Sequence, residues 1–568
     1  MILPMSLAPG NFTVTSELTI NASGVILRGS GSAAGGSVIT FSAGTGVSVN
    51  GPGSWTTTTT VNAMDLYIPS GGKTIRVEDA SAFNVGDEVT VNRKVTAKWI
   101  KYVYMDQMYQ DGFLQRWLSP GRVHSGHRKV TAKNGNTLTL DGSLVDTYDC
   151  YTLGFPVATV SKGSYSQQRL SKIGYESFYF TVDPPRSGAS MFMNNVENCW
   201  MNDLISLNCA NTVKLEAGCR RITVNNVSAT HTIPNDEAGP PSDFTFNGTD
   251  ILMCNIRTQT SGANQWSVVT FEGNTGPLVV VNSKNRMSPH MRWTTGILED
   301  SSYFDQDMGS LGLAFINRGI TGSGHGWTTG SSVAWNFTVD DGYGCYAAPG
   351  SMNYCIGGGG GTVDISKNPQ GHYESFGTFV TPASLYLQQL KDRINVSALP
   401  YQTIDDVVSC TVPGNATIAE NTRTITAEVA PGTTSLTVDV ATSPGATWRL
   451  YSDFACTTEI TDKVMTLSAG DNIRYIKVTS ADGTIEKIYT LIVRVGTMPP
   501  PVLDVAVGAG NVVLSWSTNW PGFTLQSTTN LNLPSSWVSN PPPPLVSGRT
   551  YVVTNGTTGD EKYYRLKK

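Results

Sequence analysis

Hydrophobic residues alternate with polar ones in short segments that return every 20 to 30 residues along the first 400 positions. Such alternation predicts strands with one buried face, and Asn, Ser and Thr flank these segments as turn formers do. The three best-matched segments are separated by steps of 23 and 29 residues. Their inward positions, in order, are Cys199, Met201 and Leu204, then Ile222, Val224 and Val227, then Ile251, Met253 and Ile256.

The repeat continues toward residue 400 without a helical period or a strand–helix alternation between the strands. Strands so related are expected to stack in parallel about 4.8 Å apart, with the variable lengths absorbed in the turns. A repeat of this length is typical of a solenoid. We therefore predict an all-β chain in which residues 1–403 form a right-handed parallel β-helix. The further rungs begin at Leu278, Ile297, Leu313, Val333 and near Tyr354.

Residues 71–150 interrupt the repeat with short hairpin-like strands, from GGKTIRVEDASAFNVGDEVTV to GNTLTLDGSLVD. We predict a small β insertion that projects from the solenoid. Its aromatic residues allow two interpretations, one wall of a cleft or a local hydrophobic core. These residues are Trp99, Tyr102, Tyr104 and Trp117.

The composition changes near residue 404, after SLYLQQLKDRIN, which is expected to be a helix that closes the solenoid. Alternating strands then fill residues 404–497, and the Pro cluster MPPPV marks a linker before residues 498–568. Residues 409–495 resemble the cadherin-like β-sandwich modules of secreted bacterial enzymes. Residues 501–568 resemble a small C-terminal β module of exported bacterial proteins. The resemblances imply two small β-sandwich-type modules that space the solenoid, anchor it, or contact a cell surface or glycan.

Composition narrows the set of partners. Only 15% of residues are charged and glycine occurs 58 times, a balance that suits β-structure with tight turns. The formal net charge of -5 gives no basic field for nucleic acid, and no apolar run is long enough for a membrane span. Neither is expected as a partner.

The nine cysteines suggest two pairs to test as disulfides, Cys345 with Cys355 and Cys410 with Cys456. Buried thiols are expected at Cys199, Cys219 and Cys254. The opening residues lack the charged and apolar regions of a signal peptide, whereas the rest reads as extracellular. We expect a trimmed form of a secreted or extracellular protein.

Counting from the first inward residue of each rung places the following turns on one edge. His290 and His325 both fall 12 residues past their rung's first inward position, with the rung at Ile297 between them. That spacing predicts a separation of about 10 Å along the axis. Packing between long turns remains the alternative explanation for any single residue. The residues gathered at this edge are His231, Asn264, Gln265, Trp266, His290, Arg292, Trp293, Asn317, Arg318, His325, Trp327 and Tyr343.

These residue types suit β-elimination on a uronic acid, which needs a cation beside the carboxylate, a base for the C5 proton and an acid for the leaving O4. Arg292 or Arg318 would be the cation, and His290 or His325 the base. Tyr343 or the second histidine would be the acid. The remaining residues would bind substrate, with Trp266, Trp293 and Trp327 stacking on sugar faces. The predicted function is a polysaccharide lyase.

Two other functions remain open. A glycoside hydrolase needs two carboxylates about 5 to 9.5 Å apart, and a non-catalytic β-helix would only bind glycan. No cofactor is expected, because the nearest candidate Ca²⁺ ligands, Asp236, Glu237 and Asp243, lack a recognisable ligand spacing. The carboxylates available to a hydrolase are Glu299, Asp300, Asp305, Asp307, Asp340 and Asp341.

Three segments resemble the pectate-lyase-like superfamily of β-helix proteins. FTVTSELTINASGVILRGSG resembles its first coils, although the usual N-terminal capping helix is not evident. SPHMRWTTG and NRGITGSGHGWTTGSSVAWN resemble the PHxRW and GSGHGW turns of an uncharacterised secreted branch. The resemblance covers roughly residues 10 to 400. It implies a β-helix that acts on a polysaccharide, without specifying the sugar.

Overall fold

The protein, seen here in a computed structural model, divides into two compact units, residues 1–401 and 402–568, each of which is described by itself. The structure describes residues 3–567 apart from the following positions: 33–34, 186, 189, 234–241, 261–265, 271, 305–310, 340–341, 359, 366–368, 376, 383, 395–406, 412–415, 420–423, 431, 443–445, 454–455, 480–485, 496–500, 509, 519–521, 532–535, 540–542, 548–549 and 557–561.

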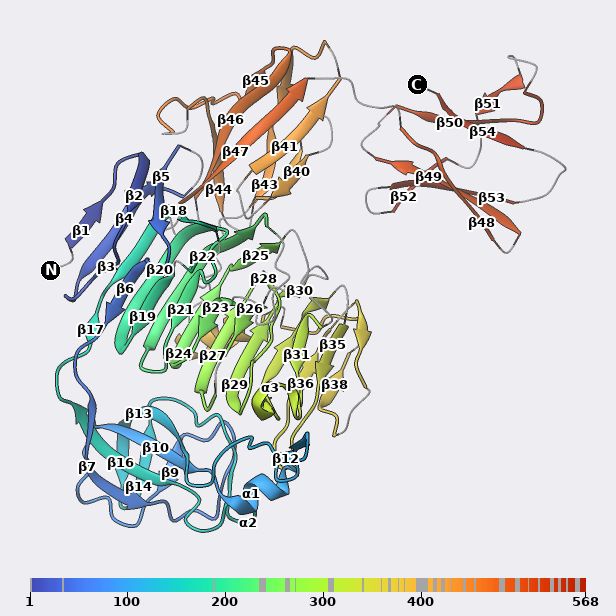
Figure 1. The fold of residues 1–568 in the computed structure, drawn as a ribbon. Coiled ribbons are helices and arrows are strands. Elements are labelled where there is room, and N and C mark those ends of the chain that lie inside the picture. The colour runs from blue at the N-terminus through green and yellow to red at the C-terminus, as the bar shows by residue number, and fades with distance from the viewer. Residues whose placement is uncertain are drawn as a thin grey trace. The chain divides into compact units, whose positions relative to one another are not determined.

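The first unit is built from parallel strands that stack one coil on the next, as the row of arrows in Figure 1 shows. Successive strands of the largest sheet pair in parallel with the neighbouring coil, which confirms the predicted parallel β-helix. These strands are β4 (Val25–Gly31), β18 (Gly174–Asp183), β20 (Val196–Leu207), β22 (Arg220–His231), β24 (Thr249–Cys254), β27 (Thr275–Val281), β29 (Thr294–Asp300), β33 (Val333–Trp335), β36 (Tyr354–Ile356) and β38 (His372–Glu374).

After its long strand, a typical coil bends into a short strand of the same sheet and then turns again into a second sheet, which forms the second face of the solenoid. Short strands after the first turn extend the large sheet, among them β25 (Arg257–Thr260), β28 (Lys284–Asn285), β30 (Tyr303–Phe304) and β34 (Thr338–Val339). Parallel bridges through Met287 connect the two parts of the second face. Its strands are β3 (Leu18–Thr19), β6 (Val47–Asn50), β19 (Met191–Asn194), β21 (Val213–Leu215), β23 (Ser242–Phe246), β26 (Trp266–Val269), β31 (Leu313–Phe315), β35 (Gly342–Cys345) and β37 (Thr362–Val363).

The predicted register is confirmed over five coils. Cys199 pairs with Ile222, Ile222 with Ile251, Ile251 with Leu278, and Leu278 with Ile297. These side chains are buried and fill the interior together with those of the second face. Stacked apolar side chains removed from water supply the main stabilisation of such a solenoid.

Two rung assignments were wrong. Leu313 lies on β31, in the second sheet of the coil that begins with β29, and is not the start of a separate rung. Val333 is half-buried, and its neighbour Ala334 is the inward residue. Alternation looks the same in either sheet, so the sequence does not say to which face a short strand belongs.

Polar residues with left-handed backbone conformation mark the bend between the two parts of each coil. Asn255 and Asn282 have φ of 54° and 50°, and Asn282 donates from Nδ2 to Asn255 Oδ1 at 2.6 Å. Asparagine tolerates this conformation better than most residues. The stacked asparagines at this bend thus connect the coil of β24 to the coil of β27.

The insertion is larger than the predicted residues 71–150, since its six-stranded antiparallel sheet begins at Trp55 and ends at Tyr165. It leaves the solenoid after β6 and returns before β17 (Leu170–Ser171). Two short helices, α1 (Ala97–Tyr102) and α2 (Cys150–Leu153), lie at one end of it. The six strands are β7 (Trp55–Asn62), β16 (Thr159–Tyr165), β10 (Glu88–Lys94), β13 (Val123–Asn134), β14 (Thr137–Leu140) and β9 (Thr74–Arg76).

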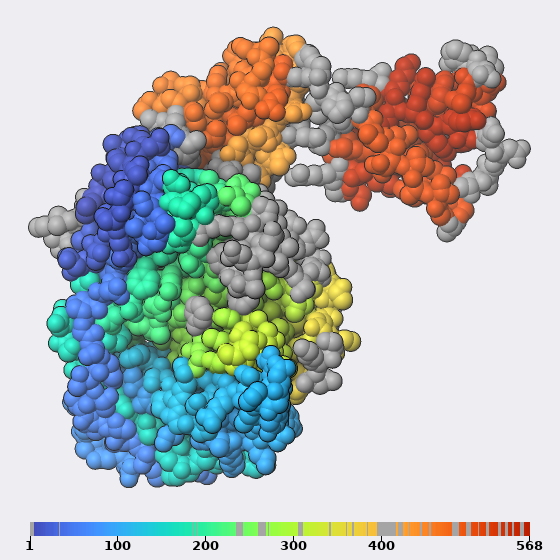
Figure 2. All heavy atoms as spheres, in the orientation of Figure 1, coloured from blue at the N-terminus to red at the C-terminus, as the bar shows by residue number. Residues whose placement is uncertain are grey.

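The insertion and the solenoid share a hydrophobic core. Trp99 and Trp117 of the insertion are buried, and each packs against Trp293 of the solenoid, with ring centroids 5.1 Å and 5.9 Å apart. Trp327 belongs to the same cluster. In Figure 2 the blue atoms of the insertion lie directly against the yellow-green coils. The local-core interpretation of Trp99 and Trp117 is thus confirmed, whereas Tyr104 is 69% exposed.

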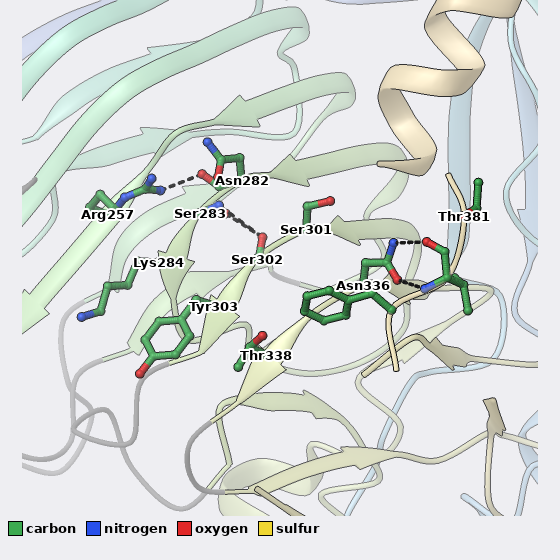
Figure 3. Close-up of a pocket in the computed structure, with 12 residues that line it drawn as sticks. Arg257, Asn282, Ser283, Lys284, Ser301, Ser302, Tyr303, Asn336, Thr338 and Thr381 are labelled. Carbon is green, nitrogen blue, oxygen red and sulfur yellow. Dashed lines mark hydrogen bonds between the residues drawn. The ribbon is translucent and has the colours of Figure 1, made fainter. Parts of the chain in front are cut away.

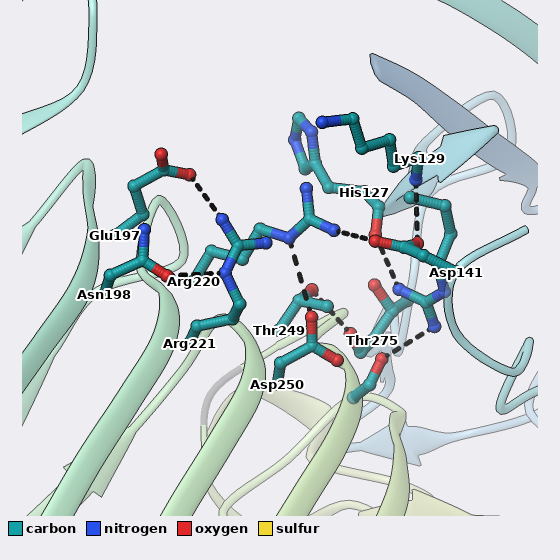
Figure 4. A network of polar contacts seen from close by, with 12 residues as sticks. His127, Lys129, Asp141, Glu197, Asn198, Arg220, Arg221, Thr249, Asp250 and Thr275 are labelled. Atoms are coloured by element: carbon teal, nitrogen blue, oxygen red, sulfur yellow. Dashed lines mark hydrogen bonds and ion pairs between the residues drawn. The ribbon is translucent and has the colours of Figure 1, made fainter. Parts of the chain in front are cut away.

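A polar network ties the insertion to earlier coils (Figure 4). The buried guanidinium of Arg220, on β22, pairs with Asp141 of the insertion at 2.7 Å and approaches Asp250 at 3.5 Å. Arg128 of the insertion donates to the carbonyl of Gly276 at 3.0 Å. The insertion is therefore fixed at both ends, by charge and hydrogen bonds here and by tryptophans at the other.

After the last coil, α4 (Leu385–Ile394) forms where the closing helix was predicted. The second unit then contains a sandwich-type module and a smaller two-sheet module, both all-β, as expected. None of the helices among the described residues has the length and hydrophobicity needed to cross a bilayer. The first module pairs β40 (Thr417–Ala419), β41 (Thr424–Val429), β47 (Glu486–Val495), β46 (Gly470–Thr479) and β44 (Thr447–Tyr451), and the second is built on β48 (Asp504–Gly508), β49 (Asn511–Ser517), β53 (Thr550–Gly556), β50 (Thr524–Thr528) and β54 (Tyr563–Lys567).

The cysteine expectations have mixed outcomes. Cys345 and Cys355 are separate buried thiols in contact with each other, so the predicted disulfide between them is wrong. The side chain of Cys410 lies outside the described residues, so its pairing with Cys456 stays a prediction. Cys199 and Cys219 are buried thiols as expected, and Cys254 is half-buried.

Truncating Trp117 is expected to destabilise the first unit. Trp117→Ala removes a fully buried ring and leaves a cavity, which costs about 3–5 kcal/mol of unfolding free energy. Urea denaturation followed by circular dichroism measures it. Phe113→Ala, at a position that is 75% exposed in the same insertion, should change the unfolding free energy by less than about 0.5 kcal/mol. Equal effects of the two substitutions would contradict the shared core.

Candidate functional site

The turns SPHMRW and NRGITGSGHGW lie on adjacent coils at one edge of the solenoid. The backbone N–H of Arg292 donates to the carbonyl of His325 at 3.1 Å, and the backbone N–H of Trp293 donates to the carbonyl of Trp327 at 3.0 Å. The imidazole rings of His290 and His325 meet edge to face, with centroids 4.8 Å apart. The two turns therefore carry their histidines to one point.

The predicted separation of about 10 Å between His290 and His325 was wrong, because the two turns lie on neighbouring coils. His290 closes the coil that begins with β27, and His325 closes the next coil, which begins with β29. Because Leu313 belongs to the second sheet of that same coil, no rung separates the two turns. The observed 4.8 Å is the spacing expected of neighbouring strands.

Two arginines hold the turns together. Arg318 donates from Nη1 to the backbone carbonyl of His290 at 2.9 Å. Arg292 donates from Nη2 to the carbonyl and the hydroxyl of Ser323, at 2.9 and 2.8 Å. Each guanidinium thus connects one turn to the other. Charged donors satisfy turn carbonyls that would otherwise be poorly paired.

A carboxylate missed by the sequence reasoning completes this network. Glu272 pairs with Arg292 at 3.0 Å and also forms an ion pair with Arg122 of the insertion. Glu272 precedes β27 just as Arg292 precedes β29, so the two residues occupy similar positions on neighbouring coils. The backbone N–H of Gly273 donates to the carbonyl of Arg292 at 3.0 Å. Counting backwards from each strand, as well as forwards, would have found it. Ser323, the other missed residue, gave no sequence signal.

Both imidazoles are neutral at neutral pH. Burial lowers the pKa of His290 to about 4, with the charges of Arg318, His325 and Arg292 acting in the same direction. Burial also lowers the pKa of His325 to about 4, together with Arg318 and Arg292. A neutral imidazole can accept a proton, and the neighbouring guanidiniums provide positive charge for an anionic ligand.

Gly322 lies against the ring of His325 and has φ of 59°. A Cβ at that position would lie 2.6 Å from His325 Nε2, closer than van der Waals contact allows. A residue other than glycine would therefore strain the backbone and displace the imidazole. Nδ1 of His325 is buried and has no hydrogen-bond partner among the described residues.

The tryptophans predicted to stack on sugars are structural. Trp293 and Trp327 are only 1% and 2% exposed. Trp293 donates from Nε1 to Asp146 at 2.9 Å, and Trp327 donates to the carbonyl of Val103 at 2.9 Å. Both rings pack into the core shared with the insertion, so neither can form a sugar platform.

Other predicted site residues also lie away from the histidine pair. Tyr343, the predicted acid, points into the solenoid between Phe337 and Tyr373, with ring centroids 5.1 and 6.2 Å away. Its side chain is only 2% exposed, so it does not reach an external substrate, and the same burial raises its pKa well above the usual range. His231 is buried and shares a 2.8 Å hydrogen bond with Asp243. Both assignments are corrected to structural roles.

The rest of the predicted set divides in two. Asn317 accepts the backbone N–H of Gly319 at 2.8 Å, which shapes the turn beside Arg318. Asn264 and Gln265 lie outside the described residues, as does the side chain of Trp266. Their substrate-binding roles stay predictions.

The carboxylates available to a hydrolase do not form a pair at this edge. Glu299 is buried inside the solenoid beside Asn285, and burial raises its pKa to about 8. Asp300 accepts the backbone N–H of Tyr386 and the hydroxyl of Ser384, both at 2.7 Å, at the start of α4. The other hydrolase candidates, Asp305, Asp307, Asp340 and Asp341, lie outside the described residues.

Among the described residues, no group of three or more His, Cys, Asp or Glu side chains is placed to hold a metal ion. Of the three carboxylates considered as Ca²⁺ ligands, Asp243 is buried beside His231, and residues 236 and 237 fall outside the described ranges.

Comparison with known proteins identifies one module of the chain. Residues 392–496 match the cadherin-like β-sandwich domain family. This finding confirms the cadherin-like resemblance noted for residues 409–495. No curated protein matches the sequence.

Three phage tailspikes are similar in structure. The first, from Acinetobacter baumannii bacteriophage AP22 and solved in complex with A. baumannii capsular saccharide, is 13% identical with a TM-score of 0.32, over 63% of this chain and 52% of its own. The tailspike of Pseudomonas phage LKA1 is 12% identical with a TM-score of 0.36, over 66% of this chain and 72% of its own.

The tailspike of Pseudomonas phage phi297 is 9% identical with a TM-score of 0.34, over 86% of each chain. In the first comparison, with the tailspike of bacteriophage AP22, this chain spans about half the length of that protein. The assignment of the fold rests on the strand pairing described above. The narrower pectate-lyase-like resemblance stays a prediction.

The low histidine pKa values predict an acid-dependent loss of stability. The unfolded histidines bind protons near their ordinary pKa of about 6.5, whereas the folded pair binds them only near pH 4. The unfolding free energy should therefore fall as pH drops from about 6.5 toward 4. Denaturation midpoints across this range measure the slope.

His124 and His127 also have lowered pKa values and contribute to the same slope. The informative quantity is the difference between the protein and a His290→Gln/His325→Gln double variant, which should lose part of the slope. NMR titration of the two imidazoles gives an independent measurement. Titration midpoints near pH 6.5 for both imidazoles would contradict the conclusion that the two rings are buried beside arginines.

Proposed function

We propose that this chain is a polysaccharide lyase that cleaves a uronic-acid-containing polysaccharide by β-elimination at the pair of His290 and His325. The observation that supports this most is the meeting of two neutral, half-buried imidazoles with two guanidiniums at one edge. A polymeric substrate implies action outside the cell.

In this proposal His325 is the base. Its imidazole is neutral at neutral pH and only half-buried, so part of the ring reaches the surface. It would accept the C5 proton of the uronate, and the C–H bonding pair would form the C4–C5 double bond. His290, packed edge-on, would hold the ring in place.

Arg318 would bind the uronate carboxylate, since its guanidinium is held at the carbonyl of His290, close enough for its charge to act on both imidazoles. Negative charge grows on that carboxylate as the proton leaves, and a fixed guanidinium stabilises it in the transition state. The C4–O4 bond then breaks with its electron pair on O4. The leaving oxygen takes up the proton held by His325, so one imidazole acts first as base and then as acid.

Arg292 has a different role in this scheme. Its Nη atoms are engaged by Glu272 and Ser323, so it positions the two turns and adds positive charge. The tryptophans contribute in the same way, as anchors of the turns. A hydrolase is less well supported, because Glu299 and Asp300 are occupied within the fold.

His325→Ala is expected to lower kcat at least about 100-fold, the usual contribution of a general base. Purified protein is incubated with a panel of uronate-containing polysaccharides. The ultraviolet absorbance of the new C4–C5 double bond reports lyase activity, and a reducing-end assay reports any cleavage. His290→Ala and Arg318→Ala should each reduce the same absorbance.

His372→Ala is the matched control, because this exposed histidine on β38 lies outside the site. It should retain full activity. Reducing ends without absorbance would support a hydrolase instead. Binding without either product would leave a glycan-binding β-helix, and equal activity of His325→Ala and the unchanged protein would place the chemistry elsewhere.

A further inference from the structure

A groove with a volume of about 720 Å³ lies on the solenoid, lined by residues other than those of the histidine pair. Figure 3 shows the labelled residues that line it. Its walls come from the bends after the long strands, from the short strands β25, β28, β30 and β34, and from residues 379–381.

One wall is a row of side chains from consecutive coils. Arg257 pairs in register with Lys284, Lys284 with Tyr303, and Tyr303 with Thr338. With neighbouring strands about 4.8 Å apart, the row extends roughly 14 Å along the solenoid axis. All four residues are half-buried, so each presents part of its side chain at the surface.

Arg257 and Lys284 occupy directly paired positions, so two cationic side chains lie next to each other on this wall. The Arg257 guanidinium donates to the carbonyls of Asn282 and Ile256, at 2.6 and 3.0 Å, which fixes it at the groove. The Lys284 ammonium lies 5.3 Å from the ring centroid of Tyr303. Both cationic side chains therefore line the groove on neighbouring coils.

The facing wall supplies apolar surface and hydrogen-bonding groups. Phe379 is 62% exposed and lies beside Val380, whose N–H and carbonyl both bond to the amide of Asn336 at 2.7 Å. The backbone under this ring is therefore held to the coil. Ser301 and Thr338, which also line the groove, add hydroxyl groups. Aromatic faces with a few fixed polar groups are typical of ligand sites.

We propose that this groove binds an acidic oligosaccharide along the solenoid axis, at a second site separate from the histidine pair. Arg257 and Lys284 would hold the carboxylates, and Tyr303 and Phe379 would pack on the sugar rings. The proposal shares its substrate class with the proposed function but requires no chemistry. It would keep a long polymer bound while another segment reaches the histidines.

Binding is measured with hexasaccharides of galacturonate, mannuronate and alternating glucuronate, each labelled at its reducing end, with a neutral xylose hexamer for comparison. The His325→Ala background prevents turnover. At least one acidic hexamer should bind, and the neutral hexamer should bind at least tenfold more weakly. Lys284→Ala should weaken the acidic hexamer about tenfold, and Lys284→Glu more. Rising salt should weaken binding, because the cations are partly exposed.

Lys214→Ala is the matched control, because this partly exposed lysine lies on β21 of the second face and pairs with Glu216. It should leave the affinity unchanged. Tyr303→Leu tests the aromatic contribution without changing charge and should weaken binding severalfold. Circular dichroism confirms that each variant is folded.

The two proposals fail separately. If no acidic hexamer binds, or if Lys284→Ala and Tyr303→Leu bind as tightly as the His325→Ala background, the groove proposal is wrong, whatever the lyase assay shows. If the acidic hexamer binds in a Lys284-dependent manner while no polysaccharide gives product, the groove proposal stands and the lyase proposal does not.

Discussion

The burial of four tryptophans between the insertion and two solenoid turns is the interaction on which the candidate site depends. Each ring removes enough apolar surface from water to contribute about 4–6 kcal/mol of transfer free energy. Long turns without such anchors would have few contacts of their own. Trp293 directly follows Arg292, and Trp327 lies two residues after His325. The hydrophobic contact therefore sets the position of the polar groups.

The same burial determines the charge state of the site. Packing the turns beneath the insertion removes water from His290 and His325 and brings two guanidiniums close to them. The arginines remain charged, whereas the imidazoles lose their protons. Glu272 offsets part of the positive charge by pairing with Arg292 and Arg122. Neutral imidazoles beside fixed cations therefore follow from the packing of the two turns.

The sequence predicted the features that repeat and missed those that depend on a partner segment. The register from Cys199 to Ile297 followed from alternation, and the convergence of His290, Arg292, Arg318 and His325 followed from counting. Trp293 and Trp327 were misinterpreted because a turn tryptophan has the same pattern whether it faces sugar or an insertion. Tyr343 was misplaced because a short strand carries no mark of the sheet to which it belongs.

The coils that begin with β27 and β29 each contribute residues both to the groove and to the edge with the histidines, so the spacing of the coils sets the spacing at both places. Lys284 belongs to the coil that ends at His290, and Tyr303 to the coil that leads to His325. The rise of about 4.8 Å per coil therefore separates neighbouring residues along the groove and also separates the two histidines. A polymer repeats its groups along one direction as well, so a row of side chains parallel to the axis, which begins with Arg257 and Lys284, matches it better than a single pocket would. In the two proposals, the same stacking that brings the two histidine turns together also aligns the groove with the solenoid axis, where the rest of a bound polysaccharide would lie.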